Sequence, residues 1–170
     1  MEAAINQLFL FPELSLLRDE YLVQHGFTPQ TRKVLAELWK SNIEKASILD
    51  KYATVLLALQ HPPFDRGANP FQSVKCLMDL RNAVVHFKDG WRDANGAHRI
   101  EKLLKGKFNG NKFIGDSEVD YFPSHCLSAG CAKWAAESAL TFADEFFDKI
   151  GVKPWHGRSK HLYTAWPETL

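Results

Sequence analysis

The sequence predicts an all-α protein, an up-and-down bundle of four to five helices over residues 1–151. Three observations support this fold class. Apolar residues recur at three- and four-residue steps over long stretches. Thr28-Pro29 and Asn69-Pro70 have the form of a helix cap followed by a first-turn proline, and glycines or prolines close the same stretches. With 170 residues, 45% of them hydrophobic, the chain is long enough to bury one core.

Each expected helix has a start or stop signal in the sequence. The first begins at Pro12 and stops before Gly26, and the second is a long amphipathic helix that ends at His61-Pro62-Pro63. The third follows Asn69-Pro70, the fourth is short, and the last stops at Gly151. The expected helices cover residues 12–24, 29–61, 70–87, 97–105 and 125–150.

Two segments are expected to lack helix. Residues 106–120 are rich in Gly and Asn, and they fit either a small hairpin around Asn109-Gly110 or an irregular loop. Residues 152–170 are expected to form an irregular tail packed on the domain or on a dimer partner. This tail mixes basic and aromatic side chains, so binding of single-stranded RNA is an alternative role.

Charge and cysteine content restrict the class of protein. The 21 Lys and Arg and 20 Asp and Glu give a formal net charge of +1, which does not indicate a strongly basic nucleic-acid-binding surface. Three cysteines are an odd number and do not fit a secreted disulfide framework. The apolar patch before Pro12 is too short for a signal peptide or a membrane span. We therefore expect a cytoplasmic protein that does not enter a membrane.

The third expected helix has an arginine on its apolar face. At 3.6 residues per turn, five apolar residues lie within about 60° of Arg81. Since a buried arginine must be paired, a carboxylate, a carbonyl, a partner chain or a ligand phosphate should meet it. The five residues are Val74, Leu77, Met78, Val84 and Val85.

The opposite side of this helix is polar. It carries Lys75, Asp79, Asn82 and His86, and the last two are four residues apart and can touch. Arg81 and His86 are separated by about 140° around the axis. A straight helix therefore does not bring these two side chains together without a second chain or a change at the helix end.

The segment from Met78 to Phe87 resembles the R-x4-6-H signature of the HEPN superfamily. It has Arg81, a polar Asn82 directly after it, aliphatic residues between, and His86. Arg18–His25 and Arg92–His98 have the same spacing but not this helical, apolar context. The resemblance implies a HEPN-like helical bundle that forms a homodimer with its signature helices facing each other. It also implies a metal-independent endoribonuclease, as in toxin–antitoxin or phage-defence systems.

The resemblance assigns a role to each motif residue. His86 would act as general base on a ribose 2′-OH or as acid toward the leaving 5′-oxygen. Arg81 would bind the scissile phosphate, and Asn82 would orient His86 or contact that phosphate. The products would be a 2′,3′-cyclic phosphate and a 5′-hydroxyl, with no metal or cofactor required.

Three further residues, Lys75, Asp79 and Lys88, are expected to contact the RNA substrate. Lys88 also marks a departure from the family. Members paired with a nucleotidyltransferase antitoxin often extend the motif to His-x-Tyr, and this chain has Lys88 where the tyrosine would be. Control by nucleotidylation of that tyrosine is therefore not expected, although an antitoxin or other partner protein remains open.

A non-catalytic interpretation fits the same residues. Arg81 would bridge to a buried carboxylate such as Asp50, Asp144 or Glu145, and His86 would cap the helix through its dipole. The chain would then be a HEPN interaction module that dimerises and binds a partner protein or nucleotide.

Two other clusters of residues are candidates for a site. His125, Cys126 and Cys131 suggest zinc, but the Cys-x4-Cys spacing is unusual for that metal and no second pair completes four ligands, so no metal site is predicted. Four lysines near the Gly- and Asn-rich segment are either a solvated face or a guide for RNA. These are Lys102, Lys105, Lys107 and Lys112.

Overall fold

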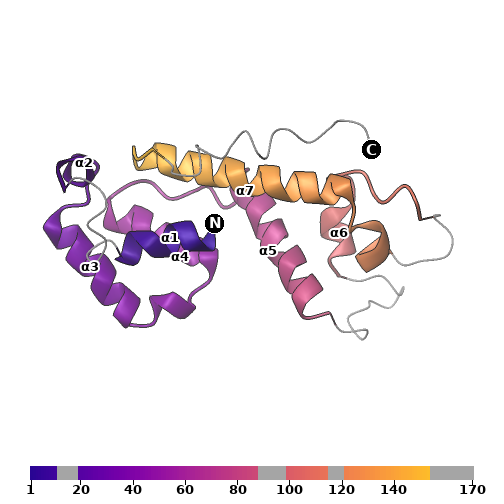
Figure 1. Ribbon diagram of the computed structural model, residues 1–170, viewed down its shortest axis with the longest axis horizontal. Helices are drawn as coiled ribbons and strands as arrows, with labels where there is room; N and C mark the ends of the chain where they lie inside the picture. The colour runs from indigo at the N-terminus through magenta and orange to yellow at the C-terminus, as the bar shows by residue number, and fades with distance from the viewer. Residues whose placement is uncertain (11–18, 88–98, 115–120, 154–170) are drawn as a thin grey trace. The chain divides into compact units, whose positions relative to one another are not determined.

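The structure is a computed structural model that describes residues 1–10, 19–87, 99–114 and 121–153. Within these ranges every regular element is a helix and no strand is present (Figure 1). The predicted all-α class is confirmed.

The helices are distributed over two compact units, each described below by itself. One unit consists of residues 1–65 with 143–170, and the other of residues 66–142. A single folding domain can contain two such units, so the domain predicted over 1–151 stays a prediction. In chain order the elements are α1 Glu2–Leu10, α2 Asp19–Gln24, α3 Pro29–Lys40, η2 Ile43–Lys45, α4 Ile48–Ala58, α5 Phe71–Val85, α6 Glu101–Leu104, η3 Tyr121–His125 and α7 Ala129–Lys149.

Helix α1 was not predicted. Its nine residues carry a short apolar run, and a helix of this length is not stable without tertiary packing. In the structure α1 packs on α3 and α4, and Ile5 and Phe9 are completely buried. The Phe9 ring lies 5.6 Å from that of Trp39, centroid to centroid. The helix expected at 12–24 appears as α2, and its first part, 12–18, lies outside the described residues.

The single long helix predicted over 29–61 is wrong. The chain leaves the helix at Ser41, and Asn42 takes a left-handed conformation with φ of 78°. Helix α4 then starts at its own cap, where the Ser47 hydroxyl accepts from the Asp50 N–H at 3.2 Å and donates to the Asp50 carboxylate at 2.7 Å. The apolar period continues through the break, and for that reason periodicity alone did not reveal it.

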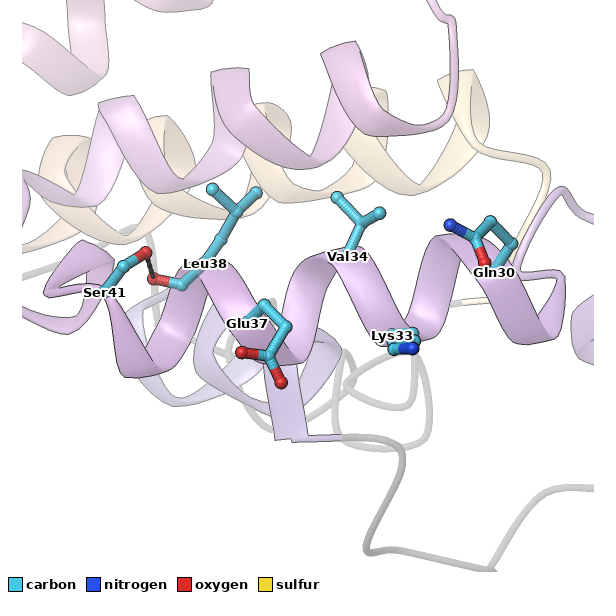
Figure 2. Close-up of a pocket in the computed structure, with 6 residues that line it drawn as sticks. All are labelled: Gln30, Lys33, Val34, Glu37, Leu38 and Ser41. Atoms are coloured by element: carbon cyan, nitrogen blue, oxygen red, sulfur yellow. Dashed lines mark hydrogen bonds between the residues drawn. The ribbon is translucent and has the colours of Figure 1, made fainter.

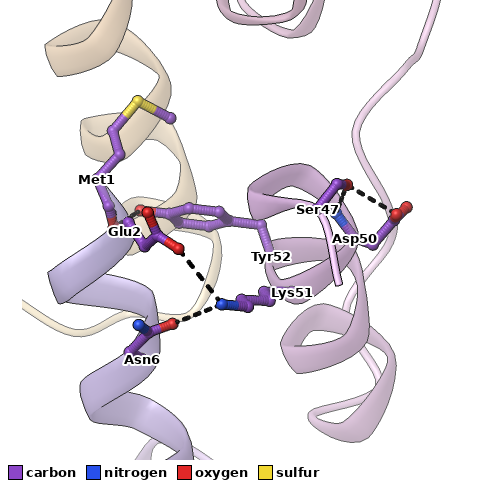
Figure 3. Close-up of polar contacts among 7 residues, drawn as sticks. All are labelled: Met1, Glu2, Asn6, Ser47, Asp50, Lys51 and Tyr52. Carbon is purple, nitrogen blue, oxygen red and sulfur yellow. Dashed lines mark hydrogen bonds and ion pairs between the residues drawn. The ribbon is translucent and has the colours of Figure 1, made fainter. Parts of the chain in front are cut away.

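Lys51 of α4 is held in the interior of the first unit by contacts with α1, shown in Figure 3, and with α3. Its side chain is 1% exposed, donates to Asn6 Oδ1 at 3.1 Å and lies 3.6 Å from Glu2 Oε1. Its ammonium is also 5.4 Å from the centre of the Trp39 ring. The neighbouring Tyr52 is fully buried, and its hydroxyl donates to the Met1 carbonyl at 3.1 Å. These contacts fix the start of α1.

The second unit is built around one side of α5, whose predicted span of 70–87 is confirmed to within two residues at each end. Cys76, Leu80 and Ala83 on that side are buried in a hydrophobic cluster. The other buried members come from α6 and the residue before it, from η3 and the residue after it, and from the start of α7. They are Ile100, Leu104, Phe122, Cys126 and Cys131.

The Gly- and Asn-rich segment forms turns and loop as far as it is described, over 106–114, and no hairpin forms there. The weak helix predicted at 97–105 is reduced to the single turn of α6. At the far end of α7, Val152 is buried and the Lys153 N–H donates to the Tyr21 hydroxyl at 3.0 Å. The rest of the predicted tail, 154–170, lies outside the described residues, as does 115–120.

Candidate functional site on helix α5

The apolar face predicted around Arg81 is buried only in part: Val74 is completely buried, Leu77 and Met78 are half-buried, and the part next to Arg81 is exposed. The hydrophobic cluster of the second unit contacts Cys76, Leu80 and Ala83, roughly 130° around the helix from Arg81. Val84 and Val85 remain 43% and 58% exposed. The prediction that Arg81 is buried is therefore wrong, because the sequence shows a face but does not show which face the neighbouring elements cover.

Arg81 is exposed, and its side chain contacts the next residue of the motif. An Nη1 N–H of Arg81 donates to Asn82 Oδ1 at 3.0 Å. A guanidinium has five N–H donors, so this single bond leaves a planar fork for an anion such as a phosphate. No ion pair joins Arg81 to a carboxylate among the described residues. Asp50, one of the carboxylates proposed for it, contacts Ser47 instead.

His86 ends the helix. Its backbone N–H donates to the Asn82 carbonyl at 2.9 Å, and φ of −112° places it just outside the helical region. The imidazole is exposed. The chain after it is held by Phe87, whose ring lies 5.7 Å from that of Phe122 on η3. His86 is thus a solvent-accessible imidazole on an anchored backbone.

Of the three residues predicted to bind the substrate, two lie in the described part of the chain. Lys75 is exposed on α5, and Asp79, one turn later, is half-buried. Both lie on the helix that carries the motif. Lys88 lies outside the described residues.

The structure brings Arg81 and Asn82 into direct contact and places His86 one turn beyond Asn82. One copy of α5 does not bring Arg81 and His86 together, because they differ by about 140° around the axis. The exposed valines beside them were assigned to the core from the sequence. Only the positions of the other helices reveal that they face outward.

The three cysteines are part of the hydrophobic core. Cys76, Cys126 and Cys131 are free thiols buried in the hydrophobic cluster of the second unit. Burial raises the pKa of all three, that of Cys126 to about 12, and the neighbouring Cys131 thiol adds to the shift at Cys126. A thiol must lose its proton to bind a metal. Over the described parts of the chain, no three His, Cys, Asp or Glu side chains are grouped so that they could hold a metal ion.

A shallow hollow of about 390 Å³ runs along α3 (Figure 2). All of its lining residues come from that helix or its cap, and two of its polar groups already have partners. The Glu37 carboxylate pairs with Lys40 at 3.1 Å, and the Ser41 hydroxyl donates to the Leu38 carbonyl at 3.1 Å. The other lining residues are Gln30, Lys33 and Val34. A hollow made by one helix face lacks the converging polar groups of a ligand site.

No family model, curated protein or solved structure matches the chain. The resemblance to the HEPN superfamily stays a prediction. None of the described helices is long and apolar enough to cross a bilayer.

Proposed function

We propose that the chain is a cytoplasmic, metal-independent endoribonuclease of HEPN type that works as a homodimer, in the manner of a toxin or phage-defence effector. The observation that supports this most is that Arg81, Asn82 and His86 are all exposed on α5. A phosphate-binding fork and an imidazole are therefore both open to a substrate. The three free cysteines fit a reducing compartment.

The exposed valines supply the reason for a dimer. Val84 and Val85 flank Arg81 and His86, and apolar surface of this kind is stabilised when a second copy covers it. Two α5 helices packed face to face would place the Arg81 of one copy near the His86 of the other. The angular separation within one helix then ceases to be an obstacle.

In the proposed reaction the ribose 2′-oxygen attacks the adjacent phosphorus. The bond from phosphorus to the 2′-oxygen forms while the bond to the 5′-oxygen breaks. One His86 accepts the 2′-OH proton, and the His86 of the second copy donates a proton to the leaving 5′-oxygen. Arg81 stabilises the charge on the non-bridging oxygens, and Asn82 holds the guanidinium in position. The products are a 2′,3′-cyclic phosphate and a 5′-hydroxyl.

A non-catalytic interaction module is the second candidate. It is favoured by the same exposed valines, because an apolar strip serves partner binding as well as dimerisation. In that case the α5 face would bind a partner protein or nucleotide.

Cleavage of a mixed RNA substrate in EDTA distinguishes the two candidates. We expect cleavage by the wild-type protein, with products that carry a cyclic phosphate, and a loss of at least a hundredfold in rate for Arg81→Ala and His86→Ala. His61→Ala is the matched control, since it removes a histidine outside α5. Each variant is first shown by circular dichroism and sedimentation to be folded and in the same oligomeric state as the wild type. Absence of cleavage by intact wild-type dimers would support the module.

A further inference from the structure

The loop after α6 concentrates positive charge. Residues 102–114, which comprise the last three residues of α6 and this loop, contain four lysines and no acidic residue, whereas the entire chain has a formal net charge of only +1. All four lysines are exposed. The remainder of the protein is therefore net acidic, and this loop differs from it in sign. The lysines are Lys102, Lys105, Lys107 and Lys112.

An aromatic side chain projects from the same loop. Phe113 is 94% exposed and follows Lys112 directly. Its backbone N–H donates to Asn111 Oδ1 at 3.0 Å, so the turn that presents it is closed by a side-chain hydrogen bond. A phenyl ring held in solvent offers both faces for stacking.

The base of the loop is anchored to the start of α7. Ser128 Oγ donates to the Asn109 carbonyl at 2.8 Å, and the Asn111 N–H donates to the His125 carbonyl at 2.9 Å. The Phe108 ring lies 5.5 Å from that of Trp134. The loop and α7 approach so closely that a Cβ at Gly130 would lie 2.5 Å from the Asn109 carbonyl oxygen. The lysines and Phe113 are therefore presented by a fixed backbone.

We propose that this loop binds single-stranded RNA, with Phe113 stacked on an unpaired base and Lys105, Lys107 and Lys112 on the flanking phosphates. Basic side chains beside an exposed aromatic ring are how proteins hold single strands without reading their sequence. An anionic lipid surface would also attract the lysines, but one phenyl ring buries little apolar area in a bilayer. The choice of RNA rests on the proposed ribonuclease, and the loop would bind the substrate in addition to Arg81 and Lys75 of α5.

Equilibrium binding of a fluorescent 2′-O-methyl oligonucleotide tests the loop without requiring cleavage. We expect Phe113→Ala to weaken binding about tenfold. Lys107→Gln with Lys112→Gln should reduce the slope of log affinity against log salt by about 1.4, since each phosphate contact on a single strand contributes about 0.7. Lys40→Gln with Lys45→Gln removes the same charge elsewhere, and Leu57→Ala removes another exposed apolar side chain. Both controls should bind as the wild type does.

The outcomes separate the loop from the catalytic proposal. If the loop variants lose binding while no variant cleaves RNA, the loop inference holds and the ribonuclease fails. If the loop variants bind the oligonucleotide with unchanged affinity and cleave RNA with unchanged KM, the loop inference is wrong, whether or not α5 carries the catalytic residues. Wild-type protein that binds phosphatidylserine vesicles but not the oligonucleotide would also overturn it, in favour of a lipid surface.

Discussion

At the scale of single residues, Lys51 and Arg81 show how a charge is accommodated in this protein. Lys51 is buried, and a carboxylate, an amide oxygen and an aromatic ring meet its ammonium. Arg81 lies among apolar residues in sequence and yet is exposed. The apolar pattern of the helix favoured Arg81 as a buried cation, because such a pattern shows only which residues share a face. Whether that face is covered depends on which side of α5 the rest of the second unit packs against.

Replacing Lys51 should separate its packing from its charge. We expect Lys51→Ala to lower the free energy of unfolding by about 2–4 kcal/mol, since it leaves a cavity against Trp39 and removes the partner of Asn6. Lys51→Met keeps most of the volume and should cost less than half as much, because Glu2 is half-exposed and can be solvated. Urea unfolding of the two variants measures the difference. Equal losses would show that the ion pair, and not the packing, holds α1.

At the scale of elements, the strongest sequence signals predicted correctly where helices lie. The start of α3 has the predicted cap, with the Thr28 hydroxyl accepting from the Thr31 N–H at 3.1 Å. Helix α5 was predicted from Asn69-Pro70 and from the apolar period, and its span is confirmed. The predicted cap at Asn69 is wrong, because Pro70 occupies the cap position and no side chain caps the helix. The break at Asn42 was missed because Ser41, Asn42 and Ser47 are weak signals within an uninterrupted period. Capping by Ser47 outweighed helical continuity.

The candidate site was predicted in part. The motif residues were identified from their order in the sequence, and the structure places Arg81 and Asn82 in contact on α5 and His86 at the end of that helix. Their exposure was not predictable, because it depends on the packing of α6 and α7 against the other side of α5. Phe113 was missed altogether, since an aromatic in a Gly- and Asn-rich segment looks the same in sequence whether it is buried or exposed.

The two sides of α5 should respond differently to substitution. Leu80→Ala removes a buried side chain from the cluster and should cost about 2–4 kcal/mol of unfolding free energy. Val85→Glu lies on the exposed side and should change the unfolding free energy of the monomer by less than about 0.5 kcal/mol. Sedimentation should then show that Val85→Glu dissociates the dimer. A folded Val85→Glu variant that still dimerises would place the dimer contact elsewhere and remove the support for a composite site.

At the scale of the whole molecule, the core of the second unit links stability to pH. Burial raises the pKa of Cys126 from 9.0 to about 12, and it also raises the pKa of Cys76 and of Cys131. The folded protein therefore keeps protons that the unfolded chain releases above pH 9. By linkage, this part of the stability is fully present below pH 9 and is lost as the pH rises toward 12.

Urea unfolding at pH 8 and pH 10 tests this linkage. Between these values we expect the wild-type protein to lose roughly 1 kcal/mol through Cys126 alone, in addition to any change from groups that titrate elsewhere. Cys126→Ala removes the thiol. The unfolding free energy that this variant loses between pH 8 and pH 10 should therefore be smaller than the wild-type loss by roughly 1 kcal/mol, whatever the stability of the variant at pH 8. The comparison of the two differences cancels the background from lysines and the other thiols. Identical losses in the two proteins would mean that Cys126 ionises as readily folded as unfolded, and that the cluster admits water.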